Sequence, residues 1–251
     1  MLVIGTSAVG CNASDSLGQT ASCTWSVVVL APPMLAITKF LAFGDSLTAG
    51  VVSAPVQGVS THAPAKSYPF KSQMTLAQLY LTQFIDFVNA GLSGEDAALA
   101  LGRFQSRLAQ HQPEAVFIME GSNDLGDLEA GTGPGEDVAI TMIESMVVAT
   151  KVAGADPFVM TIPPQRANLA TADLVVPYND KLRALAARQN ATLIDVFGII
   201  SSGQCPSAAS TFPCLGDDHL HPTEQGYERI ADAVVNTLIK EVDEHLGKTL
   251  T

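Results

Sequence analysis

The sequence predicts an α/β fold in which a parallel sheet of five strands is covered by helices on both faces. Between residues 35 and 246, short apolar runs alternate with helix-like segments of roughly 10–20 residues. This alternation is typical of βαβ units, because two parallel strands need a long crossover that is usually a helix. The expected strands are residues 37–44, 85–89, 115–120, 157–162 and 192–196.

The segments between these strands have the apolar spacing of helices. Within residues 96–110, for example, Leu101, Phe104 and Leu108 recur at helical spacing. Three longer connections, residues 50–66, 122–135 and 198–221, are expected to be functional loops at the carboxyl edge of the sheet, where open α/β folds bind ligands. The expected helices are residues 68–81, 96–110, 136–153, 172–190 and 223–246.

The first 33 residues differ from the rest. Residues 3–11 and 21–30 are β-prone and are separated by turn-forming residues, which predicts a β-hairpin. The pattern A-x-D-x-x-G-x-T-A-S-C-x-W-x-V-x-V resembles the last hairpin of a hyalin-repeat or immunoglobulin-like sandwich. Two strands alone are marginal in water, so residues 1–33 are interpreted as a remnant of an upstream β-domain plus a linker, and residues 34–251 as the catalytic domain. Alternatively, the hairpin belongs to the catalytic domain itself.

The charge of the chain excludes some classes of partner. Thirteen basic and twenty-five acidic residues give a net charge of −12. This charge disfavours nucleic acid and anionic membrane surfaces. We also expect no membrane span, because no apolar stretch reaches the ~18 residues that a spanning helix needs.

The four cysteines form two close pairs, Cys11 with Cys23 and Cys205 with Cys214. There is no C-x-x-C motif, so a zinc ribbon or a thioredoxin-like site lacks support. Local pairs fit two disulfides in an oxidising compartment, which predicts an extracellular or periplasmic protein. The alternative is four unrelated buried thiols.

A candidate nucleophile follows the first strand of the domain. Ser46 lies in Gly44-Asp45-Ser46-Leu47-Thr48, just past a buried apolar run. Taken alone, this serine could simply cap the next helix. The elbow G-x-S-x-G of the α/β-hydrolases is absent, because Thr48 stands where that motif needs glycine.

A candidate base lies near the other end of the chain, in Asp217-Asp218-His219-Leu220-His221-Pro222. Asp218 precedes His221 by three residues, so its carboxylate can accept a hydrogen bond from the imidazole and fix its tautomer. The competing interpretation is a metal site made by Asp217, Asp218, His219 and His221. No further ligand cluster is visible, and a metal site would leave Ser46 unexplained.

Two further blocks lie between these segments, Asn89-Ala90-Gly91-Leu92-Ser93-Gly94 and Gly121-Ser122-Asn123-Asp124. The four blocks, in this order, resemble the SGNH (GDSL-type) hydrolases over residues 35–246. The resemblance implies a three-layer α/β/α sandwich, similar to flavodoxin-like architectures, with Ser46, Asp218 and His221 as the catalytic residues. It also implies an oxyanion hole made by the backbone N–H groups of Ser46 and Gly94 and the side chain of Asn123. Gly91 is a rival for the position of Gly94.

The expected activity is hydrolysis of carboxylic esters with short- to medium-chain acyl groups, through an acyl-Ser46 intermediate and without a cofactor or metal. The expected partner is a small-molecule or carbohydrate ester. One alternative is a carbohydrate O-acetyl esterase; the other, from a different class, is an inactive binding module. The sequence does not indicate the natural substrate or the oligomeric state.

Overall fold

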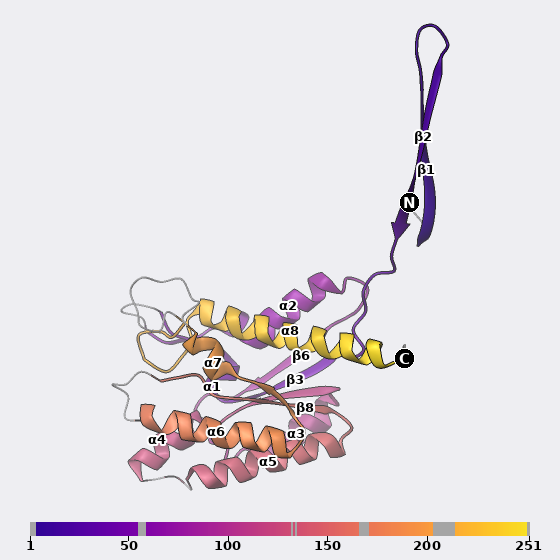
Figure 1. Cartoon of the computed structure of the whole chain (residues 1–251). Helices are drawn as coiled ribbons and strands as arrows, with labels where there is room; N and C mark the ends of the chain where they lie inside the picture. The colour runs from indigo at the N-terminus through magenta and orange to yellow at the C-terminus, as the bar shows by residue number, and fades with distance from the viewer. Residues whose placement is uncertain are drawn as a thin grey trace.

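The computed structural model describes residues 4–54, 59–131, 133, 135–165, 171–202 and 214–249. It confirms the predicted fold: a five-stranded parallel sheet in the order β6-β3-β7-β8-β9 lies between two layers of helices (Figure 1). The carboxyl ends of these strands meet at one edge of the domain. The strands are β3 (Lys39–Gly44), β6 (Asp86–Gly91), β7 (Ala115–Met119), β8 (Asp156–Met160) and β9 (Thr192–Ile194).

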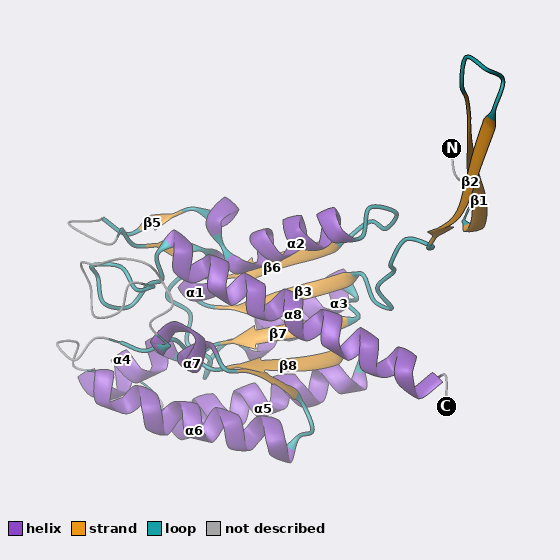
Figure 2. Ribbon diagram, turned by 45° about the horizontal axis from the view of Figure 1, so that its top comes forward, coloured by secondary structure: helices purple, strands orange, loops and turns teal. Residues whose placement is uncertain are grey.

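Helices cover both faces of the sheet (Figure 2). On one face α2 packs against α8, and on the other α5 lies between α3 and α6. The bounds are α2 (Tyr68–Leu79), α3 (Leu101–His111), α5 (Glu136–Val152), α6 (Ala172–Arg188) and α8 (Glu224–Thr249).

A row of phenylalanines on four neighbouring strands fills the core on one side of the sheet. Phe87, Phe40, Phe117 and Phe158 come from β6, β3, β7 and β8, and each is at most 4% exposed. The ring centroids of Phe117 and Phe158 are 4.5 Å apart, and those of Phe87 and Phe117 are 5.3 Å apart. Burial of these rings fixes the relative position of the strands whose ends carry the site.

The predicted loops contain more regular structure than expected. Residues 122–135 include helix α4 (Ser122–Ala130), residues 198–221 include most of α7 (Val196–Ser201), and residues 50–66 include strands β4 (Val51–Val52) and β5 (Thr61–His62) with the 3-10 helix η1 (Pro64–Lys66). Residues 122–135 were expected to form a loop, but Ser, Asn and Asp, the residue types at its start, also commonly begin helices.

Helix α3 begins five residues later than predicted, at Leu101 rather than at residue 96. The Asp124 carboxylate accepts the backbone N–H groups of Ala97 and Ala98, at 2.8 and 3.0 Å. These bonds hold residues 96–100 in turns instead of a regular helix.

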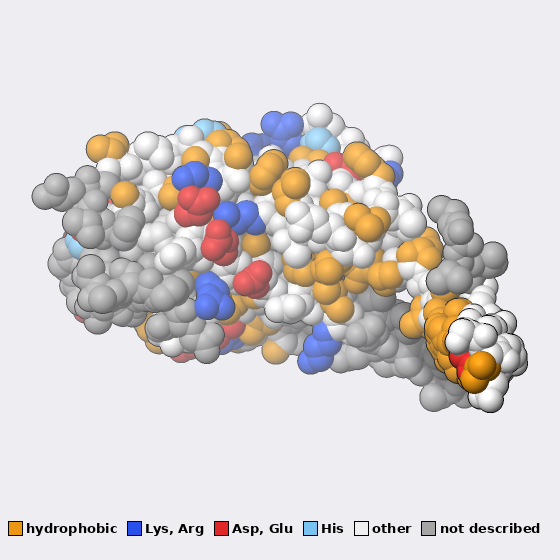
Figure 3. Space-filling model, turned by 90° about the horizontal axis from the view of Figure 1, so that it is seen from above, with side chains coloured by type: hydrophobic (Ala, Val, Ile, Leu, Met, Phe, Trp, Pro, Cys, Tyr) orange, Lys and Arg blue, Asp and Glu red, His pale blue; other side chains and the backbone are white. Residues whose placement is uncertain are grey.

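The N-terminal residues form an antiparallel hairpin that projects from the domain. Strands β1 (Gly5–Ser14) and β2 (Thr20–Val29) share ten residue pairs, and a disulfide joins the facing residues Cys11 and Cys23. Alternation along the strands places Val9, Trp25 and Val27 on the face that carries the disulfide, and mostly serine and threonine on the other. Figure 3 shows the hairpin nearly end-on, with its hydrophobic side chains gathered on one side.

The chain after the hairpin is fastened to the domain at Leu35. The Gln83 amide accepts the Leu35 N–H at 2.7 Å and donates to the Leu35 carbonyl at 2.9 Å. The second predicted disulfide, Cys205–Cys214, lies outside the described residues, because Cys205 is not among them.

Candidate active site

Ser46 lies at the carboxyl end of β3, in the first turn of the short helix α1 (Ser46–Ala49). Asp45 caps this helix: its Oδ1 accepts the Leu47 N–H at 2.8 Å. Gly44 is required here, because a Cβ would overlap the Thr48 hydroxyl and the Met119 carbonyl. The Ser46 side chain is held at the sheet edge with only 8% of its surface exposed.

The structure brings together the three residues predicted to act on the ester. The Oγ atom of Ser46 lies 2.9 Å from Nε2 of His221, although the two residues are 175 positions apart. The other ring nitrogen, Nδ1, lies 2.7 Å from Oδ2 of Asp218. This is the arrangement of nucleophile, base and orienting carboxylate by which a serine hydroxyl is activated.

Asp218 is well suited to remain ionised. Partial burial opposes ionisation, but hydrogen bonds from the His221 ring, the Ser60 hydroxyl and the backbone N–H groups of His221 and Leu220 together hold the pKa of Asp218 well below its usual range. Ser60 was missed by the sequence analysis, because it lies in the 50–66 loop without a recognisable pattern.

The segment that carries Asp218 and His221 is fixed against the two residues that follow β4, shortly after α1 in the chain. The Asp217 N–H donates to the Ala54 carbonyl at 2.8 Å, and the Asp218 N–H donates to the Ser53 hydroxyl at 3.3 Å. Because α1 and these residues are consecutive in the chain, the same segment positions nucleophile and base.

Among the described residues, the His219 ring forms no hydrogen bond with Ser46 or Asp218. His219 has a left-handed backbone (φ 69°), and its buried Nδ1 has no hydrogen-bond partner among the described residues. Within the described ranges, no group of three or more His, Cys, Asp or Glu side chains is placed to hold a metal ion.

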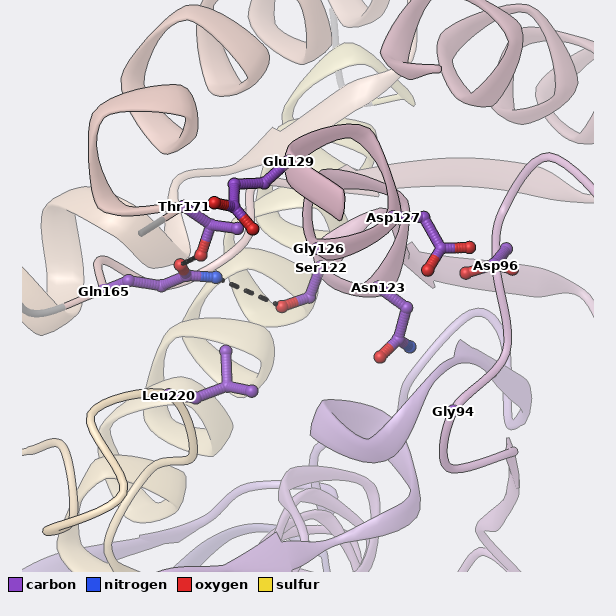
Figure 4. A pocket seen from close by; sticks show the side chains of 10 residues that line it. All are labelled: Gly94, Asp96, Ser122, Asn123, Gly126, Asp127, Glu129, Gln165, Thr171 and Leu220. Carbon is purple, nitrogen blue, oxygen red and sulfur yellow. Dashed lines mark hydrogen bonds between the residues drawn. The ribbon is translucent and has the colours of Figure 1, made fainter. Parts of the chain in front are cut away.

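The two further predicted oxyanion donors, Gly94 and Asn123, line one cavity of about 510 Å³ (Figure 4). Gly94 has φ +80°, which favours glycine, and Asn123 lies in the first turn of α4. The Asn123 Nδ2 donates to the Glu95 carbonyl at 2.8 Å, which ties the Gly94 loop to α4. The rival Gly91 packs against the α1 backbone, where a Cβ would overlap Ala49.

Most of the residues that line this cavity have polar side chains. Asp96 and Asp127 lie side by side on one rim (Figure 4), and burial, followed by the charges of Asp124, Asp127 and Glu95, raises the pKa of Asp96. Leu220 is the large apolar residue among the described lining residues. The cavity is completed by Ser122, Gly126, Glu129, Gln165 and Thr171.

Comparison with known proteins identifies the family of this chain. The sequence pattern of the GDSL-like Lipase/Acylhydrolase family matches residues 42–229, which include Ser46 and His221. The chain belongs to this family. This GDSL-family chain is therefore a carboxylic ester hydrolase. No curated protein sequence matches it.

Several solved structures share the fold. One is LAE5, described as an alpha/beta hydrolase enzyme from the metagenome of Lake Arreo, Spain. It is 22% identical with a TM-score of 0.66, and the match covers 82% of this chain and 96% of the LAE5 chain. Axe2, an acetylxylan esterase from Geobacillus stearothermophilus, is 20% identical with a TM-score of 0.66 and the same coverage. A putative lipolytic protein of the G-D-S-L family from Desulfitobacterium hafniense DCB-2 is 18% identical with a TM-score of 0.61, over 79% and 98% of the two chains.

Across the part of the chain that the structure describes, no helix is both long and apolar enough to span a bilayer.

Proposed function

We propose that this protein is a serine esterase in which Ser46 is acylated, His221 transfers the protons and Asp218 orients His221. The observation that carries the proposal is the unbroken chain of contacts from Ser46 Oγ to His221 Nε2 at 2.9 Å and from His221 Nδ1 to Asp218 at 2.7 Å. The inactive-module alternative gives no reason for these three side chains to be aligned.

In the proposed reaction, Ser46 Oγ attacks the ester carbonyl carbon while His221 Nε2 takes its proton. The ionised Asp218 stabilises the resulting imidazolium. Negative charge develops on the carbonyl oxygen, which the N–H groups of Ser46 and Gly94 and the amide of Asn123 stabilise as neutral donors. His221 then gives its proton to the leaving alcohol.

A water molecule completes the cycle. His221, again neutral, takes a proton from this water, which attacks the acyl-Ser46 carbonyl, and Ser46 Oγ leaves with that proton. Each step uses only the substrate, water and side chains of this chain.

A second candidate, a carbohydrate O-acetyl esterase, is favoured by the cavity beside Gly94 and Asn123. A medium-length acyl chain would have to cover the Asp96 carboxylate, which is costly without compensating hydrogen bonds. Sugar hydroxyls would supply those hydrogen bonds. A polar alcohol with a small acyl group therefore fits this lining better than a long apolar chain.

The test combines labelling with a substrate panel. A fluorophosphonate probe is expected to label the wild type at Ser46, found by peptide mass spectrometry, and to leave Ser46→Ala unlabelled. Labelling at another serine, or none at all, would refute the proposal. Nitrophenyl esters of rising chain length, assayed beside acetylated xylan, distinguish the two candidates: turnover that rises with chain length would exclude the carbohydrate esterase.

We also propose that residues 1–33 are the end of a β-sandwich domain and that the protein works outside the cytoplasm. The apolar face of the hairpin is what one sheet of a sandwich presents to the other, and the Cys11–Cys23 disulfide suits an oxidising compartment. Fractionation of the source cells tests the location: activity confined to the cytoplasm would contradict it.

A further inference from the structure

Two buried carboxyl groups lie behind the nucleophile, and the proposed reaction uses neither. Asp45 is 0% exposed and Glu120 is 1% exposed. The Oδ1 atom of Asp45 accepts the Leu47 N–H. Its Oδ2 and both side-chain oxygens of Glu120 have no hydrogen-bond partner among the described residues. An ionised carboxylate that is buried without hydrogen bonds is strongly destabilising.

The register of the sheet places the two carboxyl groups next to each other. Strands β3 and β7 are parallel neighbours, and Gly44 pairs with Met119. Asp45 and Glu120 are the next residues of the two strands. Because neighbouring strands lie about 4.8 Å apart, both side chains leave adjacent backbone positions at the same sheet edge. Asp45 also caps α1, so it touches the turn that carries Ser46.

The nearby cation is already engaged. The Arg103 guanidinium binds Glu95 through Nε at 2.7 Å, and its Nη1 donates to the Ala90 carbonyl at 2.7 Å. Its Nη2 faces Glu95 and the Gly44 carbonyl. Arg103 therefore lowers the pKa of Glu120 without forming an ion pair with it.

The other charges that face Glu120 are negative. Burial raises the pKa of Glu120 well above its usual value, and the charges of Asp45, Glu95 and Asp124 raise it further. The neighbouring tyrosines, Tyr68 and Tyr178, are buried, and their own pKa values are raised, so both stay neutral.

Asp45 is the more easily ionised of the two groups. Burial, helped by the charge of Asp124, raises the pKa of Asp45 to about 7, against the opposing effects of the Leu47 N–H, the His221 ring and the Ser122 N–H. The Ser122 N–H thus favours the ionised form of Asp45. A proton on Glu120, the next residue of the neighbouring strand, can serve as the partner of the free oxygen of Asp45.

We propose that Glu120 is a neutral carboxylic acid in the folded enzyme and donates its proton in a hydrogen bond to Oδ2 of Asp45. The pair then holds one proton and one negative charge. The bond joins the end of β7 to the cap of α1 and makes Glu120 a positioning residue for Ser46. The positioning role rests on the proposed function, whereas the shared proton does not.

The shared proton can be observed without any assay of activity. At pH 8, ordinary carboxyl groups are ionised, so the infrared C=O stretch of a protonated carboxylic acid reports Glu120. We expect this band in the wild type, its loss in Glu120→Gln, and its persistence in the matched control Glu129→Gln, which changes an exposed acid. Absence of the band from the wild type, or its survival in Glu120→Gln, would overturn the proposal.

The positioning role is tested by two substitutions of the same residue. Gln keeps a donor for Asp45 without titrating, so Glu120→Gln should retain kcat within about threefold. Leu removes the donor, so Glu120→Leu should lower kcat and the rate of fluorophosphonate labelling about tenfold or more at an unchanged KM. Equal kcat values for the two variants would refute the positioning role. A wild type that is not labelled would refute the proposed function instead, and the infrared result would stand.

The pair also predicts a pH effect on stability. Because the folded-state pKa of Glu120 is raised, its contribution to the stability of the fold is present at low pH and is lost as the pH rises through that pKa. As the pH is raised, the thermal midpoint of Glu120→Gln should therefore rise relative to that of the wild type. If Glu120→Leu does not fold, this comparison still decides the matter, because parallel pH profiles would contradict a shared proton.

Discussion

The hairpin and the catalytic domain contain similar residue types but are held together differently. In the domain, Phe117 is completely buried among aromatic rings from three other strands. In the hairpin, Trp25 is 49% exposed, and a disulfide links the two strands. Burial therefore supports the strands that carry the site, whereas a covalent bond and a backbone ladder support the hairpin. The two regions should respond independently to mutation.

The largest expected effect is on the chemistry of the domain. His221→Ala should lower kcat/KM on the order of 10⁴-fold, nearly as much as Ser46→Ala, because the two residues act as one unit. The matched control His219→Ala should be mild, since the Ser46–His221–Asp218 contacts do not include this ring. Steady-state assays with and without a chelator check both. If His219→Ala were as inactive as His221→Ala and chelation abolished wild-type activity, the metal interpretation would replace the serine mechanism.

The next effect distinguishes the buried core of the domain from the hairpin. Phe117→Ala removes a ring from the row across the sheet and should lower the free energy of unfolding of the domain by about 3–5 kcal/mol. Trp25→Ala, the matched aromatic control in the hairpin, should change it by less than about 0.5 kcal/mol. Urea denaturation followed by circular dichroism measures both. A large effect of Trp25→Ala would mean that the hairpin and the domain unfold together.

A smaller effect depends on pH. The pKa of Asp218 is lower in the folded state than in the unfolded state. Its hydrogen bonds therefore stabilise the fold at pH values above the unfolded-state pKa, and this stabilisation is lost as the pH falls through the folded-state pKa. At pH 7, Asp218→Asn should therefore be less stable than the wild type by about 1–2 kcal/mol. The difference should shrink as the pH falls below about 4. Thermal melts across this range test the prediction, and a difference that grows in acid would contradict it.

The smallest effect is expected from removing the hairpin. Deletion of residues 1–33 leaves Leu35 and its two bonds to Gln83 in place, so kcat and KM should stay within about twofold. A folded but inactive deletion variant would show that the hairpin belongs to the catalytic domain. Loss of solubility alone would not contradict the prediction, and the assay uses protein verified as folded by circular dichroism.

The sequence was sufficient where a residue's role depends on local chemistry and chain order. The strand before Ser46, the spacing of Asp218 and His221 and the alternation of strands and helices all follow from nearby residues. The structure brings Ser46 and His221 within hydrogen-bonding distance, as the resemblance implied. The catalytic roles themselves stay predictions until they are tested.

The sequence was insufficient where partners come from distant segments. Nothing near Ser60 indicates that it contacts Asp218, 158 positions away. Helix α4 was missed because its first residues also form turns, and its carboxylate Asp124 in turn shortens α3. The pairing of Asp45 with Glu120 depends on strand order, since β7 lies beside β3 although β6 precedes it in the chain.

The 175 positions between Ser46 and His221 have a consequence for biosynthesis. A chain made at ~5–20 residues per second presents Ser46 about 9–35 s before His221 exists. Throughout that interval the nascent polypeptide has a serine without its base and cannot be acylated by esters around the ribosome. Because Asp218 and His221 directly precede the closing helix α8, catalytic competence arises only at the end of translation of the domain.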